Sequence, residues 1–374
     1  MEYRSFGKLD IKVSPLGFGM MRLPVDANKN IDEKQTARMV HQAIEQGLNY
    51  IDTAYAYKGS ELVTGKVLKG GYREKVYLAT KSPVWLAEKS EDFQRFLDES
   101  LKALDTDYID FYMLHSLDSN LWKNKVEKYD LVNKIIKARE SGKIRYIGFS
   151  FHDNLDLFRE ITDITPEWDF TQIQLNYLDT RFQAGLEGLE YAAGKGLGVI
   201  IMEPLRGGYL ADVPDNVQGV FANSGRTAVE WALDYLWNMP QVSVVLSGMS
   251  NMQQTEDNLA YMQRAKVGML TKKDLDIIKS AQKAFADYET IPCTGCGYCS
   301  SCPQHIAVPH CFSAYNNWAV SRDLLQEKAF YYRWDNTIGQ LADKCIGCKK
   351  CESHCPQHLP ISKLLKKVDE LFRQ

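Results

Sequence analysis

The sequence has no run of about 18 consecutive apolar residues, the length that a membrane-spanning helix requires. Its opening residues, 1–6, lack the apolar core of a secretory signal peptide. Neither sign of charge is in large excess, and a net charge of −3 gives no electrostatic reason to expect nucleic acid or a membrane as a partner. No cysteine precedes Cys293, so the disulfide pattern of a secreted protein is missing, and we expect a cytoplasmic protein.

All nine cysteines lie in a short C-terminal stretch, and eight of them form two similar runs. The runs read Cys293-x-x-Cys296-x-x-Cys299-x-x-Cys302-Pro and Cys345-x-x-Cys348-x-x-Cys351-x-x-x-Cys355-Pro. Three cysteines at two-residue gaps, followed by a cysteine–proline pair, form the bacterial-ferredoxin ligand pattern for a [4Fe-4S] cluster. Zinc is the alternative, but structural zinc sites usually combine two Cys-x-x-Cys pairs. Two runs therefore predict two [4Fe-4S] clusters.

The fourth cysteine of each run in a two-cluster ferredoxin ligates the other cluster. This rule predicts Cys355 on the cluster of the first run and Cys302 on that of the second. The first run has two residues before its fourth cysteine where the second has three, which leaves the crossover of Cys302 open. The ninth cysteine, Cys311, is expected to be a buried apolar residue or a substitute ligand.

Short apolar runs alternate with helical stretches between about residues 15 and 250, which predicts a (β/α)8 barrel. A doubly wound sheet is the alternative, but it usually has fewer strands and a glycine-rich first turn. Residues 3–13 are expected to form a hairpin that closes the barrel floor. The predicted strands are 16–20, 50–54, 76–81, 108–115, 144–150, 170–176, 198–204 and 242–248. The predicted helices include 34–46, 91–104, 132–140, 227–237 and 272–286.

A change in composition divides the chain into two expected domains, a barrel over residues 1–287 and a small, mainly helical, ferredoxin-like domain over 288–374. The second domain has an internal repeat, because Cys302-Pro-Gln-His-Ile-Ala-Val resembles Cys355-Pro-Gln-His-Leu-Pro-Ile.

Catalytic residues of a (β/α)8 barrel lie at the C-terminal ends of its strands. Those ends carry Asp52, Lys81 and His115, with Tyr57 in the loop after the second strand. A tyrosine with its ordinary pKa near 10 is a poor acid at neutral pH, but a neighbouring ammonium favours the phenolate. A carboxylate would hold that ammonium, and a histidine would orient a carbonyl oxygen. The set predicts proton transfer to a carbonyl that receives hydride from a nicotinamide.

These residues lie in motifs that resemble the aldo-keto reductase family. Residues 47–65, GLNYIDTAYAYKGSELVTG, are similar to its first signature, and Ala79-Thr-Lys81-Ser and Met113-Leu-His115-Ser supply the other two positions. Residues 142–150, GKIRYIGFS, are similar to its motif at the fifth strand. The resemblance covers roughly residues 3–265, and with the cysteine domain it narrows to the subfamily with a C-terminal two-cluster domain. It implies an NAD(P)H-dependent oxidoreductase.

The resemblance also implies which residues hold the nucleotide. They are Gly19, Met20, Asp52, Ser150, Gln172, Met202, Pro204, Leu205, Gly207, Gln254 and Asn258. Met202 stands where an aromatic ring usually stacks on the nicotinamide. Gly248 and Gln254 stand where members that prefer NADP carry a lysine and an arginine, so NADH or dual use is favoured.

The sequence leaves the substrate open, because the pocket loops carry no specificity signature. Candidate pocket residues are Met21, Arg22, Trp85 and Arg206. The favoured function is hydride transfer between a nicotinamide and a carbonyl or alcohol, with the clusters coupled to a ferredoxin- or flavodoxin-type carrier. The alternatives are a reductase whose clusters are only structural and an electron-transfer or interaction subunit whose barrel is not catalytic.

Overall fold

The computed structural model describes residues 1–332 and 339–374. These residues form two compact units, each of which contains two stretches of the chain. The first unit contains Met1–Pro204 and Ala232–Thr271, and the second contains Leu205–Trp231 and Lys272–Gln374. The predicted domain boundary after residue 287 was drawn from the change in amino-acid composition, whereas these units are defined by packing. The boundary therefore remains a prediction. Within the described ranges, no helix is long and apolar enough to span a membrane.

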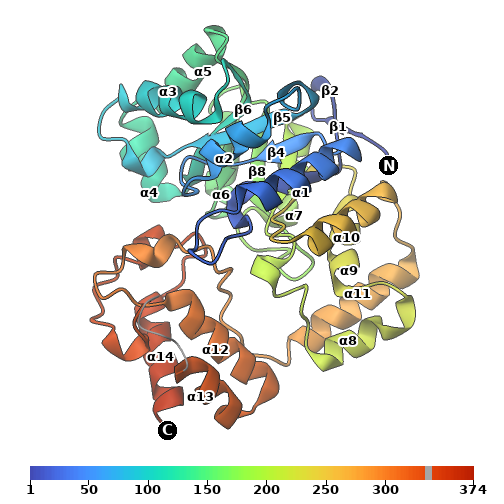
Figure 1. Cartoon of the computed structure of the whole chain (residues 1–374), viewed down its shortest axis with the longest axis vertical. Helices are drawn as coiled ribbons and strands as arrows, with labels where there is room; N and C mark the ends of the chain where they lie inside the picture. Colours follow the sequence, from blue (N-terminus) through green and yellow to red (C-terminus); the bar gives the residue numbers. More distant parts are fainter. Residues whose placement is uncertain (333–338) are drawn as a thin grey trace. The chain divides into compact units, whose positions relative to one another are not determined.

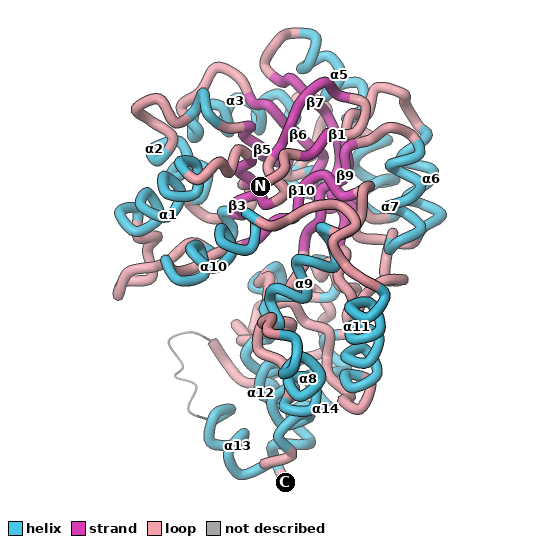
Figure 2. Tube along the Cα trace, turned by 90° about the vertical axis from the view of Figure 1, so that its right-hand side faces the viewer, coloured by secondary structure: helices cyan, strands magenta, loops and turns pink. Residues whose placement is uncertain are grey.

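Eight parallel strands of the first unit close into a barrel, in the order β10-β3-β4-β5-β6-β7-β8-β9. This confirms the predicted (β/α)8 fold. Figure 2 shows the strands, in magenta, gathered inside the helices of this unit. The strands are rich in apolar residues that are buried on both faces, as expected for parallel strands covered by helices. They are β3 (Leu16–Gly19), β4 (Tyr50–Asp52), β5 (Tyr77–Ser82), β6 (Ile109–Leu117), β7 (Ile144–Phe151), β8 (Phe170–Gln174), β9 (Gly198–Met202) and β10 (Val242–Ser247).

Amphipathic helices connect these strands (Figure 1). In the helix that follows β5, for example, Phe93, Phe96 and Leu97 are buried at helical spacing. Asp32 begins the first helix by accepting a hydrogen bond from the Gln35 backbone N–H. The helices are α1 (Glu33–Glu45), α2 (Ser60–Val67), α3 (Asp92–Leu104), the short α4 (Ser119–Leu121), α5 (Leu131–Glu140), α6 (Leu155–Asp163), α7 (Gly185–Gly194), α9 (Ala228–Trp237) and α10 (Met252–Gln263).

Each of the eight strands ends one or two residues away from its predicted end, and for three of them the structure shows a local cause. Strand β4 stops at Asp52, because the chain then turns and the carbonyl of Thr53 binds a lysine. Strand β9 stops at Met202, since Glu203 adopts a positive φ of 57°. Strand β6 continues past the predicted end because a register shift, at which Ser116 has a φ of 61°, keeps it paired with β7.

The predicted hairpin is present as strands β1 (Arg4–Phe6) and β2 (Leu9–Val13). Its Phe6 ring contacts the rings of Tyr50, Phe111 and Phe170, which come from three different barrel strands. Gly198 allows this approach, since a Cβ at that position would lie 2.2 Å from the Phe6 ring. The hairpin therefore covers the N-terminal end of the barrel with an apolar plug.

The second unit is helical in its described part. Its hydrophobic core combines apolar side chains of three helices with several of the cysteines. The two cysteine–proline segments have matching conformations, because His305 and His358 adopt φ values of 51° and 50° before a helix begins. The predicted internal repeat is therefore also a structural repeat. The helices of this unit are α8 (Asp215–Phe221), α11 (Lys272–Phe285), α12 (Val308–Ser321), α13 (Leu324–Tyr332) and α14 (Ile361–Arg373).

Candidate active site and cysteine pockets

The four side chains of the predicted catalytic set come from three neighbouring strands and one loop of the first unit. Asp52 is the last residue of β4, while Lys81 and His115 lie near the ends of β5 and β6. Tyr57 lies in the loop between β4 and α2. Because the carboxyl ends of parallel barrel strands meet at one rim, all four residues lie at the same mouth.

Lys81 is the centre of this group. Its ammonium donates hydrogen bonds to Asp52 Oδ1 at 2.6 Å and to the Thr53 carbonyl at 2.7 Å. The side chains of Lys81 and Asp52 are only 1% and 4% exposed. The Lys81 Nζ lies 5.0 Å from the centre of the Tyr57 ring, and the His115 ring stands nearly perpendicular to that ring at 6.1 Å. The structure thus brings all four predicted residues together.

Burial controls the protonation of these groups. It lowers the pKa of Lys81 and raises that of Asp52, while the attraction between the two charges opposes both shifts. The pKa of His115 is held well below its ordinary value, first by burial and then by the neighbouring Lys81 and His152. His115 is therefore a neutral imidazole at neutral pH and keeps one N–H to donate. The Trp85 ring lies against it at 5.2 Å.

The residues expected around a nicotinamide lie at the same rim of the barrel. Gln172 is buried in β8, and its Oε1 has no hydrogen-bond partner within the described residues. A buried acceptor without a partner is costly, so this position suits the N–H groups of a bound amide. Ser150 at the end of β7 accepts a hydrogen bond of 2.7 Å from the Ser116 backbone N–H. Gly19 ends β3 and Met20 follows it directly.

Two predicted nucleotide residues, Gln254 and Asn258, lie on α10. The Gln254 carbonyl oxygen accepts a hydrogen bond from the Ser250 backbone N–H, and Asn258 donates one to Ser247. These contacts hold the turn after β10. Met202 ends β9, and Pro204 is the last residue of the first unit before the division. The remaining two predicted residues, at positions 205 and 207, belong to the second unit.

A pocket in the second unit contains the predicted ligands of the first cluster. Its lining includes Cys293, Cys296, Cys299 and Cys355, together with apolar residues of α12 and α14. Burial raises the pKa of Cys299 to about 12, and the charges of the other three thiols add to the shift. Without a metal, burial keeps these thiols protonated. The positive charge of iron would lower their pKa again and allow them to bind as thiolates, so the pocket suits an iron–sulfur cluster.

The second predicted set is also drawn together. Burial raises the pKa of Cys351 to about 11, and the neighbouring thiols of Cys302 and Cys345 contribute. Cys302 therefore lies beside the second run, as the crossover rule requires. Cys348 is exposed. Over residues 1–332 and 339–374, no group of three His, Cys, Asp or Glu side chains is arranged to hold a single metal ion, whereas each thiolate of a cubane binds a different iron.

The ninth cysteine, Cys311, is fully buried on α12. Burial raises its pKa to about 12, and a hydrogen bond to Tyr331 opposes the shift. Its surroundings suit the predicted role of a buried apolar residue.

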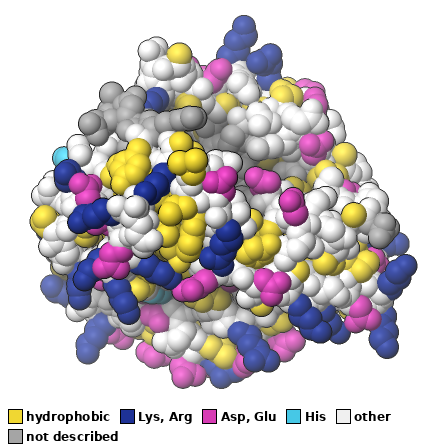
Figure 3. Space-filling view, turned by 90° about the horizontal axis from the view of Figure 1, so that it is seen from below, with side chains coloured by type: hydrophobic (Ala, Val, Ile, Leu, Met, Phe, Trp, Pro, Cys, Tyr) yellow, Lys and Arg dark blue, Asp and Glu magenta, His cyan; other side chains and the backbone are white. Residues whose placement is uncertain are grey.

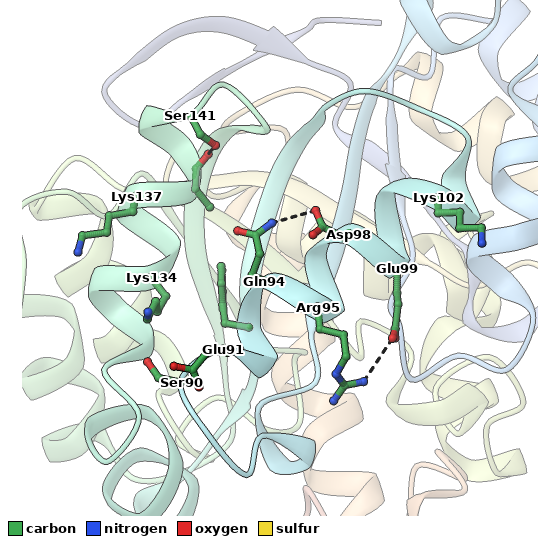
Figure 4. Close-up of a pocket in the computed structure, with 12 residues that line it drawn as sticks. Ser90, Glu91, Gln94, Arg95, Asp98, Glu99, Lys102, Lys134, Lys137 and Ser141 are labelled. Atoms are coloured by element: carbon green, nitrogen blue, oxygen red, sulfur yellow. Dashed lines mark hydrogen bonds and ion pairs between the residues drawn. The ribbon is translucent and has the colours of Figure 1, made fainter.

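A groove between α3 and α5 on the outside of the barrel has a different character (Figure 4). Its polar side chains bind one another: Gln94 donates to Asp98, and Arg95 donates to Glu99. Lys143 adds an ion pair of 2.7 Å to Asp98. Because these charges are paired within the protein, the groove has the properties of a solvated surface.

Reasoning from sequence missed two groups that take part in these sites. The Thr53 carbonyl binds Lys81 through the backbone, so no side-chain pattern could have indicated it. Thr294 lines the pocket of the first cysteine run, at a position whose residue type the Cys-x-x-Cys pattern leaves open. Glu61 was visible within the first motif, and the structure shows it buried and accepting a hydrogen bond from Thr80 behind Lys81.

A closed (β/α)8 barrel with a buried lysine–carboxylate pair at its mouth, joined to paired cysteine runs, defines an oxidoreductase with an iron–sulfur module. Comparison with known families agrees. The sequence model of the aldo/keto reductase family matches residues 15–283, and that of a 4Fe-4S dicluster domain matches residues 292–359. The chain belongs to the aldo/keto reductase family and carries a C-terminal 4Fe-4S dicluster domain.

Individual relatives resemble the barrel. L-galactose dehydrogenase of Arabidopsis thaliana is 29% identical over 284 residues, which are 70% of this chain and 88% of that protein. The uncharacterized oxidoreductase YrpG of Bacillus subtilis is 31% identical over 232 residues, 56% of this chain and 68% of its own length. The solved structure of aldo-keto reductase AKR11C1 from Bacillus halodurans, in its holo form, has a TM-score of 0.63 and 26% identity over 75% of this chain and 96% of that one.

Proposed function

We propose that this protein transfers hydride between a nicotinamide cofactor and a carbonyl or alcohol. The observation that carries the proposal is the buried Lys81, which is bound to Asp52 and lies beside Tyr57 and His115. Such a constellation has the parts of a general acid with its positioning groups.

Each residue has a distinct part in the proposed mechanism. The Tyr57 hydroxyl gives its proton to the carbonyl oxygen during reduction, and the Lys81 ammonium stabilises the charge that develops on the phenol oxygen. Asp52 orients that ammonium through the contact of 2.6 Å. His115, neutral because of its lowered pKa, donates an N–H toward the same carbonyl oxygen and orients it. A bound nicotinamide would supply the hydride.

The nucleotide would be held by Ser150, Gln172 and the turn after β10. The partnerless Oε1 of Gln172 supports an amide ligand there. Residues 248–258 contain neither lysine nor arginine, which removes two charge-assisted partners for a 2′-phosphate. We therefore favour NADH or dual use. Comparing kcat/KM for NADH and NADPH with one substrate tests this; a preference of more than about 100-fold for NADPH, roughly 2.7 kcal/mol, would contradict it.

Replacing Tyr57 by phenylalanine tests the catalytic assignment. We expect carbonyl reduction to fall by about 10²–10⁴-fold, the usual contribution of a general acid. Tyr55→Phe is the matched control, because its hydroxyl lies in the same loop but donates to the exposed carboxylate of Glu99 at 2.7 Å. Full activity of Tyr57→Phe across a panel of aldehydes and ketones would contradict the assignment.

The clusters are proposed to be ligated by the two crossed sets of cysteines, Cys293, Cys296, Cys299 and Cys355 in one and Cys302, Cys345, Cys348 and Cys351 in the other. The first set lines one pocket, and the proximity of Cys302 to Cys351 supports the second. Anaerobically purified protein should contain about eight irons, four in each cubane. Markedly fewer irons, or no reducible signal in electron paramagnetic resonance, would contradict two clusters.

An electron partner would meet the second cysteine run, which is the more exposed one. Residues 346–350 are all exposed, and Ile346, with 63% of its surface exposed, is followed by Lys349 and Lys350. An apolar tip beside lysines suits a small acidic carrier of the ferredoxin or flavodoxin type. The face of the molecule drawn in Figure 3 carries basic and acidic side chains interspersed with hydrophobic ones. Lys349→Glu with Lys350→Glu should slow reduction by such a carrier about tenfold at low salt, and an unchanged rate would contradict this docking.

A reductase with purely structural clusters is the second candidate, and the presence of cysteines in the hydrophobic core of the second unit favours it. The two candidate functions predict different changes in cluster absorbance when the protein is mixed anaerobically with NADH or NADPH. Bleaching of the cluster absorbance would support electron exchange with the barrel. Its absence would favour structural clusters or clusters reduced by a partner. For either role we place the protein in the reducing cytoplasm.

A further inference from the structure

Helices α12 and α13 of the second unit bring a buried cysteine and a buried tyrosine together. Cys311 lies on α12 and Tyr331 on α13, and both are buried. The Tyr331 hydroxyl accepts a hydrogen bond of 3.0 Å from the Ala342 backbone N–H, and the Cys311 thiol is hydrogen-bonded to both groups. Because sulfur is a weak acceptor, the phenol oxygen is the stronger partner of this N–H. The Tyr331 hydroxyl therefore fixes the backbone at Ala342.

The segment that contains Ala342 joins two stretches of chain that carry cysteines. The Ala342 carbonyl accepts a hydrogen bond of 3.1 Å from the N–H of Cys345, the first cysteine of the second run. On the other side, the Gln340 N–H donates to the His305 carbonyl at 2.7 Å. The His305 N–H donates in turn to the carbonyl of Cys302 at 2.9 Å. A chain of backbone hydrogen bonds thus connects Cys302 with Cys345 through the residues that Tyr331 holds.

The ring of Tyr331 is itself held firmly. It stacks on the Phe372 ring of α14, with ring centres 4.6 Å apart and an angle of 19° between the planes. The His310 ring lies nearly parallel to it at 6.2 Å, and His310 Nε2 is 3.2 Å from the Tyr331 carbonyl. These contacts set the direction of the hydroxyl without any contribution from Ala342. A phenylalanine at this position would keep the stacking and lose only the hydroxyl.

We propose that Tyr331 is a positioning residue for the second [4Fe-4S] cluster, the one assigned to the second cysteine run and Cys302. Its hydroxyl holds residues 340–342 in place, and this segment fixes the backbone of Cys302 and Cys345. The inference rests on the proposed function, which assigns both cysteines to that cluster. Two ligands from separate parts of the chain are aligned before iron binds, so less conformational entropy is lost when the cluster forms.

The test measures iron release from anaerobic Tyr331→Phe holoprotein to a ferrous-iron chelator. Two clusters should release iron in two phases, and Cys348→Ser, which changes an exposed ligand of the second run, identifies the phase of the second cluster. We expect Tyr331→Phe to speed this phase about tenfold, which corresponds to about 1.4 kcal/mol, the usual contribution of one hydrogen bond. The phase of the first cluster should keep its wild-type rate.

Two further variants are matched controls. Tyr332→Phe removes the neighbouring phenol hydroxyl, which donates to the Phe372 carbonyl at 3.1 Å, and should leave both phases unchanged. Asn316→Ala removes a side chain that forms hydrogen bonds of 2.7 and 2.8 Å with the backbone of Ile291, just before the first run. It should speed release from the first cluster instead. Equal acceleration of both phases in Tyr331→Phe would show a general loss of packing and overturn the proposal, as would unchanged release.

Hydrogen exchange in the wild-type holoprotein tests the same contact even where a variant fails to fold. The Ala342 amide should exchange slowly, because its phenol partner is buried. Exchange as fast as that of an exposed amide would overturn the role of Tyr331. Iron content separates this failure from that of the proposed function. Markedly fewer than about eight irons in the wild type would contradict both, whereas full iron content without a selective effect would overturn only the role of Tyr331.

Discussion

Replacing Asp52 by asparagine tests how the barrel holds a buried lysine. In this variant Lys81 keeps the Thr53 carbonyl as an acceptor but loses its counter-charge, at a position where its side chain is 1% exposed. Removing one partner of a buried ion pair typically costs about 3–5 kcal/mol, because the other charge stays buried and uncompensated. Since one strong acceptor remains, we expect the free energy of unfolding to fall by about 3 kcal/mol at neutral pH.

The chain provides a matched control for this substitution. Lys66 and Glu33 form an ion pair of nearly the same length, 2.7 Å, with side chains that are 48% and 50% exposed. Exposed pairs contribute about 0–1 kcal/mol, so Glu33→Gln should change the free energy of unfolding by less than about 1 kcal/mol. The two variants differ mainly in burial, which makes the comparison a measure of desolvation.

The pH dependence adds a second criterion. Burial lowers the pKa of Lys81, and the Asp52 carboxylate is the main group that opposes this shift. Without that carboxylate, the pKa of Lys81 should fall further. The native state then binds fewer protons than the unfolded state below the ordinary lysine pKa of about 10.4, so the stability of the variant rises with pH. Urea unfolding followed by circular dichroism should show the deficit of Asp52→Asn shrinking between about pH 7 and 9.5. Equal, pH-independent losses in Asp52→Asn and Glu33→Gln would refute the reasoning.

Three further outcomes follow from the structure. Gly65→Ala should destabilise the barrel by about 1–3 kcal/mol, because its Cβ would lie 2.6 Å from the Leu104 carbonyl oxygen. Gly194→Ala places its methyl group where no atom lies within 4 Å, and it should stabilise the barrel by about 0.5–1 kcal/mol. Thermal unfolding tests whether the melting temperature falls in the first variant and rises in the second. Because the pKa of His115 is lowered on folding, stability should be lost as pH falls below about 6.5, and His115→Gln should flatten this dependence in urea titrations; parallel curves would contradict it. Iron chelation should unfold the helices of the second unit and leave those of the barrel, and unchanged circular dichroism would argue against clusters in its core.

The fold could be predicted because its signals are repeated. Eight buried apolar runs, each followed by a helical stretch, leave few architectures other than a parallel barrel. The strand ends were less accurate, since they depend on single contacts such as the one between the Thr53 carbonyl and Lys81. The hydrophobic pattern of a strand does not indicate at which residue a backbone carbonyl leaves the sheet to bind a buried charge, so it does not predict the last residue of the strand.

The proximity of the four candidate catalytic residues could be predicted because chain order and barrel geometry bring strand ends to one rim. The association of Leu205–Trp231 with the cysteine region could not, because it depends on packing between segments far apart in sequence. The contact of Gly207 with Thr294 involves a residue without a side chain and a backbone carbonyl, neither of which leaves a pattern in the sequence. The structure is needed to show that Gly207 lies against Thr294, and only then does the need for glycine at this position become clear.

A nicotinamide passes two electrons together, whereas a [4Fe-4S] cluster passes one, and the sequence shows no flavin motif that could convert between them. Direct electron flow between the barrel and the clusters would therefore need an additional one-electron intermediary. Clusters that are only structural need no such intermediary. A nucleotide that binds the barrel without bleaching the cluster absorbance would favour structural clusters or clusters reduced by a partner, whereas bleaching would require an intermediary that the sequence does not reveal.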